Sequence, residues 1–521
     1  MAGIAQSPPL APQRFRIVVA TTVLLSFISF WRAAAIVLND LASSGFYAVG
    51  IAEQAFGKAA PWFILAVMLF AYAVRMVYIE SCVMFTRGGV YRVVKEAMGG
   101  TMAKAGVSAL IFDYVLTGPI SSVSAGQYLI GLLNDSMRYA GVGTVLPRDT
   151  GAMVFGVLVT LYFWRKNVIG LHESSEKALR IMYVVTVLVV MELVWCGITL
   201  LMRGGHLPPW PTVQNMDFKP EALGWLHGTW LPKVGVLGAL IAFGHSVLAM
   251  SGEETLAQVN REIEHPKLKN LKRTALVVWA YSLVFTAGSA FLAMALIPDA
   301  ERGQYTDNII SGLAMNVVGR HQLRLLLQAF VVAVGTLVLS GAVNTAIVGS
   351  NGVLNRMSED GVLSDWFRRP HPRYGTTYRL LHMIAGLQLF TILASRGHVY
   401  VLGEAYAFGV IWSFTLMTLS VLLLRFKNPS PREWRVPFNP RVGRYELPVG
   451  VALIFLVLFA TALMNLLTKK VATISGLVFT AVLFVVFTLS ERITARRRAA
   501  EVGIEQFNLS VDEKATCELV G

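Results

Sequence analysis

The sequence has little charge and almost no cysteine. Asp, Glu, Lys and Arg make up 15% of its 521 residues, whereas hydrophobic residues make up 55%. So little charge excludes an ordinary water-soluble domain. The three cysteines, Cys82, Cys196 and Cys517, are scattered and show neither a zinc-binding nor a disulfide spacing. Redox chemistry and structural metal sites are therefore not indicated.

Long apolar runs separated by short charged connectors take up most of the chain. A helix needs about 20 apolar residues to cross a hydrocarbon core roughly 30 Å thick, and these runs are continuous, not alternating as in barrel strands. The pattern predicts an all-α, polytopic membrane protein with about twelve spans. The expected spans cover residues 30–57, 61–84, 103–133, 150–165, 180–203, 232–258, 272–298, 322–350, 379–395, 399–424, 446–467 and 471–491.

Basic residues lie mainly in the connectors that follow the even-numbered spans. Because cytoplasmic connectors are enriched in Lys and Arg, we expect both termini on the cytoplasmic side of a plasma or inner membrane. The net charge of +14 then comes from juxtamembrane segments, and nucleic-acid binding is not expected.

Three parts are expected along the chain. Residues 1–29 form a cytoplasmic or interfacial segment, residues 30–491 the transmembrane domain and residues 492–521 a cytoplasmic tail. We interpret the apolar stretch 15–30 as an interfacial or re-entrant lead-in, or as an extension of the first helix. The longest exterior loop, residues 203–230, is rich in Pro and Trp and is predicted to form an ordered cap.

An acid lies within the first apolar run, in "IVLNDLASSGFYAVG". A charge at membrane depth costs about 2.5–3.5 kcal/mol on insertion scales, so Asp40 should face a cavity or a partner. Ser43, Ser44 and Gly45 are poor helix formers, which predicts an unwound segment there. Secondary transporters hold their ions and substrates at such breaks.

The sixth span contains a matching interruption, "FGHSVLAMSGEETLAQVN", at Ser251 and Gly252. Spans one and six are five apart, as two inverted five-helix repeats would require. The alternative is a glycine at a packing contact, with Glu253 and Glu254 at a cytoplasmic helix end.

The third span carries "FDYVLTGPISS". On a helix, Asp113, Thr117 and Ser121 share one face, with Tyr114 beside them. Such oxygens suit a cation or a water path, although an acid here can also be paired at the interface.

Other ionisable residues at membrane depth are expected to be structural. We interpret Arg75 and Glu80 as a pair or as snorkelling side chains. Glu192 and His245 are possible relays for which we favour structural roles, and in the tenth span Glu404 lies near the outer end.

Three stretches carry a family resemblance: "MSGEETLAQVNREIEHPKLKNLKRT", "NRMSEDGVLSDWFRRPHPRYGTTYR" and "NPSPREWRVPF". They resemble the sixth span and two cytoplasmic loops of the amino acid, polyamine and organocation (APC) transporter superfamily. The resemblance covers the chain to about residue 490. It implies a LeuT-like fold of two inverted five-helix repeats plus two C-terminal helices, with helices 1 and 6 broken.

Within that superfamily the candidate site resembles the KimA-type potassium and proton symporters. The seven-residue step from Asp40 to Tyr47 and the four-residue step from Asp113 to Thr117 both match. The sequence departs from that family at Ser251, where threonine is usual, and has no counterpart of its large C-terminal domain. By this resemblance the ion-binding residues are Asp40, Tyr47, Asp113, Tyr114, Thr117, Ser251 and Tyr406, and Glu254 takes part in proton coupling.

An oxygen-rich, electronegative site favours a monovalent cation over an anionic group. We therefore expect proton-coupled secondary transport of a small cation such as potassium. The alternative is a permease for cationic or neutral amino acids, or for polyamines. No cofactor is expected besides the coupling ion, which we expect to be a proton, and no metal besides potassium.

Other function classes lack their signatures. An enzyme is not expected, because no nucleophile elbow, phosphate loop or His/Cys metal set is present in the sequence. A channel is not expected either, because there is no repeated filter segment. The expected partners are the small substrate and the lipid bilayer, and the sequence does not give an oligomeric state.

Overall fold

A computed structural model describes residues 27–85, 89–143, 145–170, 175–428, 430–443 and 445–500. Residues 1–26, most of the predicted N-terminal segment and its lead-in, lie outside these ranges. Residues 501–521 of the predicted tail, including Cys517, also lie outside them.

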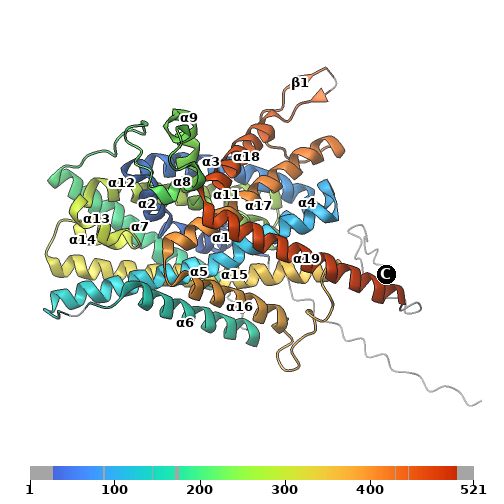
Figure 1. The fold of residues 1–521 in the computed structure, drawn as a ribbon, viewed down its shortest axis with the longest axis horizontal. Helices are drawn as coiled ribbons and strands as arrows, with labels where there is room; N and C mark the ends of the chain where they lie inside the picture. Colours follow the sequence, from blue (N-terminus) through green and yellow to red (C-terminus); the bar gives the residue numbers. More distant parts are fainter. Residues whose placement is uncertain are drawn as a thin grey trace, which may run out of the picture.

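Helices make up nearly all of the described chain (Figure 1). The α-helices of the first half are α1 (Phe30–Ser44), α2 (Ala48–Phe56), α3 (Ala60–Met84), α4 (Val90–Met98), α5 (Gly100–Tyr139), α6 (Arg148–Ile169), α7 (Ser175–Arg203), α8 (Pro220–Leu223), α9 (Gly235–Ser246) and α10 (Thr255–Val259). The others are α11 (Lys267–Ser282), α12 (Gly288–Leu296), α13 (Asp299–Tyr305), α14 (Ile309–Asn316), α15 (His321–Glu359), α16 (Tyr378–Ser395), α17 (Val399–Lys427), α18 (Val449–Thr468) and α19 (Lys470–Ala500).

Short elements connect these helices. The 3₁₀ turns are η1 (Gly57–Ala59), η2 (Gly224–Leu226), η3 (Leu231–Lys233), η4 (Val247–Met250) and η5 (Asn260–Glu262), and a π-helical turn, η6, spans Leu283–Ala287. Two-residue strands, β1 (Arg441–Val442) and β2 (Tyr445–Glu446), pair antiparallel.

The described residues contain eleven helical units long and apolar enough to cross a membrane. The first of them, Phe30–Met84, comprises two predicted spans, because η1 separates α2 from α3. Gly57 has a φ of +81° at this junction, a conformation that favours glycine. Each of the twelve predicted spans therefore has a helical counterpart, and the all-α prediction is confirmed.

Two spans are interrupted, as predicted. In the first, a turn at residues 45–47 separates α1 from α2. In the sixth, η4 and a turn at residues 251–254 separate α9 from α10. The hydroxyl of Ser44 donates to the Leu41 and Ala249 carbonyls at 2.7 and 2.9 Å, so it joins the two interruptions directly.

The first interruption begins slightly later than predicted. Ser43 and Ser44 are the last residues of α1, and the turn starts at Gly45. The Ser43 hydroxyl donates to the Asp40 carbonyl at 2.6 Å. Such back-bonding within the helix is compatible with helical geometry. Asp40 therefore lies on the last regular turn of α1, not in the unwound segment.

The long helices α5 and α15 lie side by side through the bundle (Figure 1). The most apolar window of α5 is completely buried, whereas that of α19 is 22% buried. In a membrane protein a helix that is apolar but exposed in the isolated chain faces lipid. The residues of α5 therefore line the interior, where the predicted site lies.

The predicted cap, residues 203–230, is ordered. It contains α8 and η2, and the indole N–H of Trp62 donates to the Pro208 carbonyl at 3.3 Å. The rings of Trp62 and Trp210 lie 4.7 Å apart. Aromatic contacts of this kind hold the loop against the end of α3.

Close helix packing at glycine gives a test of the fold. A Cβ on Gly50 of α2 would lie 1.9 Å from the Thr306 carbonyl oxygen, whereas one on Gly341 of α15 would meet no atom within 4 Å. We expect Gly50→Ala to destabilise the protein by about 1–3 kcal/mol through overpacking, and Gly341→Ala to be neutral or mildly stabilising. Thermal unfolding in detergent measures both, and equal effects would contradict this packing.

Candidate functional site

Three carboxyl groups meet in the interior: Asp40 on α1, Asp113 on α5 and Glu254 at the start of α10. They are 4%, 1% and 5% exposed, and they lie within electrostatic range of one another. Among the described residues, none of the three forms an ion pair. Buried carboxylates that act on one another in this way need either a cation among them or a proton on at least one of them.

The carboxyl group of Asp40 faces the interruption of the sixth span. Its Oδ2 accepts a hydrogen bond from the hydroxyl of Thr255. Gly252 has a φ of +93°, and a Cβ there would lie 3.3 Å from the Asp40 carboxyl carbon. A glycine is needed both for this backbone conformation and for the close approach of the two chains.

Glu254 lies in the turn that precedes α10. Its carboxyl group faces the backbone N–H groups of Gly252 and of Glu254 itself. Its Oε2 is buried and has no hydrogen-bond partner among the described residues. One oxygen therefore remains able to accept a proton or contact a cation.

The carboxyl group of Asp113 lies beside the hydroxyl of Tyr406, which comes from α17. The two helices approach closely, because a Cβ on Gly409 would lie 2.9 Å from that of Asp113. Close packing of α5 and α17 brings the predicted residues of the third and tenth spans together. Tyr406 is 1% exposed, so it is not an interfacial anchor.

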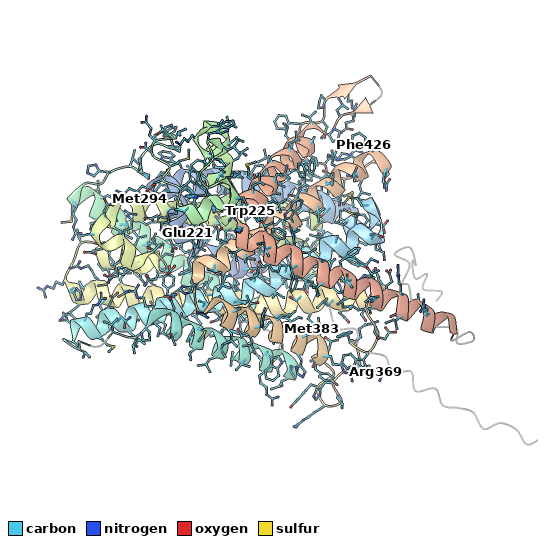
Figure 2. The ribbon with its side chains drawn as sticks, in the orientation of Figure 1. Glu221, Trp225, Met294, Arg369, Met383 and Phe426 are labelled. Carbon is cyan, nitrogen blue, oxygen red and sulfur yellow. The ribbon has the colours of Figure 1, made fainter. Side chains whose placement is uncertain are left out.

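The remaining predicted residues surround the same centre. The Tyr47 hydroxyl lies near those of Ser43 and Ser251, within electrostatic range of Asp40 and Asp113. Figure 2 draws the side chains on the ribbon of Figure 1.

Two predicted hydroxyls on α5 are already engaged. Thr117 donates to the Asp113 carbonyl at 2.9 Å, and the Tyr114 hydroxyl accepts from the side-chain amide of Gln258. Thr117 uses its proton in this bond and keeps both lone pairs for a cation, whereas one lone pair of the Tyr114 hydroxyl is occupied. Pro119, two residues after Thr117, has no N–H and therefore cannot pair with the carbonyl of Val115, four residues before it.

The prediction that Arg75 and Glu80 pair with each other or snorkel is wrong. Arg75 forms two hydrogen bonds to Glu253, at 2.5 and 2.9 Å, and both side chains are 1% exposed. Glu80 accepts from Arg425 at 2.5 and 2.7 Å and from Arg432. Residues five apart on a helix point about 140° away from each other, so the two side chains meet different neighbours.

Two residues of the site were not predicted, Thr255 and Gln258. Both follow Glu254 within the same interrupted span, and Gln258 lies one helical turn after it. In the sequence, their positions one and four residues after Glu254 were the signal that could have identified them. Glu192, in contrast, lies outside the cluster and accepts a hydrogen bond from Ser289 at 2.9 Å.

The profile of the amino acid permease family matches residues 28–487. The chain belongs to the amino acid permease family. This confirms the family resemblance carried by the interrupted sixth span and the two loops. As a permease, the protein needs a substrate site between its helices rather than a catalytic centre.

Two relatives from Bacillus subtilis (strain 168) are similar to parts of this permease. The methylthioribose transporter is 24% identical over 228 residues, which cover 43% of this chain and 46% of that protein. The potassium transporter KimA is 23% identical over 351 residues, which cover 67% of this chain and 52% of that protein. The permease thus spans about half the length of the curated relatives it matches.

Solved structures of the manganese transporter of Eremococcus coleocola are also similar. One, in complex with an aromatic bis-isothiourea substituted compound, covers 90% of this chain and 95% of its own, with a TM-score of 0.49 and 11% sequence identity.

The buried Arg75–Glu253 pair gives a second prediction. We expect Arg75→Met to lower the free energy of unfolding by about 3–5 kcal/mol, because it leaves Glu253 buried without its partner. The double variant Arg75→Met/Glu253→Met should recover most of this loss. Thermal unfolding of the two variants and the wild type measures the difference, and a double variant no more stable than the single one would contradict it.

Proposed function

We propose that this permease is a proton-coupled secondary active transporter for a small monovalent cation, with potassium as the leading candidate. The observation that carries the proposal is the meeting of three carboxyl groups, two at interrupted spans and one on α5, that form no ion pair among the described residues. An interruption near the middle of a span is where such transporters bind their cargo.

The chemistry of the site supports a cation. Asp40 and Asp113 supply carboxylate oxygens, and the hydroxyls of Tyr47, Ser251 and Tyr406 lie in the same region. Oxygen ligands of this kind suit hard cations. The carboxylate of an amino acid would instead have to approach Asp40, which is repulsive.

Glu254 is the proposed carrier of the coupling proton. It lies within electrostatic range of Asp40, and one of its oxygens has no hydrogen-bond partner in the part of the chain that the structure describes. A proton on Glu254 reduces the negative charge that the cation faces, so the occupancies of the two sites depend on each other. The similarity to the potassium transporter KimA, 23% identical, also supports this assignment.

Asp40→Asn should abolish uptake of a potassium tracer into proteoliposomes while the protein stays folded, because the change removes a charge and keeps the shape. Glu192→Gln is the matched control, since Glu192 is also buried at membrane depth but lies outside the cluster. Uptake by Asp40→Asn at the wild-type rate would remove this residue from the site.

A thermal-shift panel identifies the cargo. Potassium should stabilise the wild type and leave Asp40→Asn unchanged, and sodium, lysine, putrescine and neutral amino acids serve as competitors. Stabilisation by lysine, by putrescine or by a neutral amino acid, with none by potassium, would replace the cation proposal with the amino acid or polyamine alternative.

Glu254→Gln should separate binding from coupling. We expect exchange of labelled cation across proteoliposomes to continue, because Asp40 and Asp113 remain, while accumulation driven by a pH gradient is lost. Accumulation that still follows the pH gradient would show that another group carries the proton.

A further inference from the structure

A second cluster of ionisable groups joins the cap to the bundle. His245 lies on α9, Glu404 on α17, and Lys469 between α18 and α19; they are 0%, 7% and 2% exposed. The central site described above uses none of these three side chains. Each comes from a different part of the sequence, so the cluster holds together elements that the chain does not connect directly.

The contacts of the His245 ring are short on both sides. Its Nδ1 lies 2.8 Å from Oε1 of Glu404, and its Nε2 lies 2.8 Å from the carbonyl oxygen of Ala222 in α8. The ammonium nitrogen of Lys469 lies 3.3 Å from the same oxygen of Glu404. The histidine thus bridges the cap and α17.

Both partners of the ring are hydrogen-bond acceptors. A carbonyl oxygen never donates, and the neighbouring ammonium group of Lys469 favours the ionised, acceptor-only form of Glu404. A neutral imidazole has one N–H and can satisfy one of the two contacts, whereas an imidazolium has two and satisfies both. The observed ring position therefore fits the doubly protonated form.

We propose that His245 is a proton-binding site, separate from the central carboxyl groups, whose proton joins α9 to both the cap and α17. With the proton bound, the ring donates to the Ala222 carbonyl and to Glu404. When the proton leaves, the lone pair of Nδ1 faces a carboxylate oxygen, and the contact between α9 and α17 has to open. The ionised Glu404 and Lys469 then remain as an ion pair with no net charge.

Other polar and ionisable groups border this cluster. On α8 the nearby acid is Glu221, and α17 adds Tyr400, which lies within range of both Glu221 and Glu404. The helix α18, packed against α9, presents the uncharged Asn465 at Gly244. Figure 2 labels Glu221 and Trp225 where the cap lies against the bundle.

This site lies along the path between the cap and the central cluster. The helix α9 leads from the cap to the interruption at Ser251, and Glu404 precedes Tyr406 by two residues on α17. Both helices border the central site on the side of the cap. Protonation of His245 therefore controls how firmly α9 and α17 are joined there.

Nitrogen-15 NMR of histidine-labelled, full-length protein in lipid nanodiscs tests the proposal. A signal that disappears in His245→Gln should show two protonated ring nitrogens at about pH 6, the form in which both acceptors of the ring are satisfied. The control is His398→Gln, which removes an exposed histidine lying 3.4 Å from Asp149. A His245 ring with a single N–H at every pH would overturn the proposal.

A double variant tests the stated cause. Glu404→Gln/Lys469→Met removes the acceptor charge together with its counter-ion, and an amide can donate to Nδ1. We expect the ring to become singly protonated, with its N–H directed to the Ala222 carbonyl, already at about pH 6. Two protonated nitrogens in this variant would show that Glu404 does not hold the proton. Wild-type spectra decide the proposal if the variant fails to fold.

Discussion

Negative charge buried at membrane depth is the constraint on which this structure depends. Ionised carboxylates away from water are costly unless they are paired. The chain pairs three of them with arginine, namely Glu53, Glu80 and Glu253. It leaves Asp40, Asp113 and Glu254 without such partners among the described residues. A positive charge from outside the chain would complete that group, and the meeting of three such acids distinguishes the proposed binding site from a structural ion pair.

Glycine and the small hydroxyl residues make this arrangement possible. Gly252 lets the sixth span approach Asp40, and Gly409 lets α17 approach Asp113. Ser44 satisfies a carbonyl on each side of the contact between the interrupted spans. A bulkier residue at these positions would separate the carboxyl groups and remove the concentration of charge.

Much of this was predictable from the sequence, because its causes are local. Apolar length gives the spans, and Ser251 with Gly252 marks the second interruption. The helix partners of Arg75 and Glu80 were not predictable, because which way a side chain points depends on how distant helices pack. Thr255 was missed for the same reason, since its bond to Asp40 crosses between segments over two hundred residues apart. The orientation in the membrane stays a prediction.

The two hydrogen bonds between Arg75 and Glu253 join the second span to the unwound part of the sixth, so that the two should move together. Separating them would strand a charge in a dry interior. Any tilt that exposes the cargo to one side of the membrane must therefore carry α3 along with residues 251–254. Helices α5 and α15 supply no hydrogen-bonding group to that ion pair, so the pair itself does not tie them to this movement.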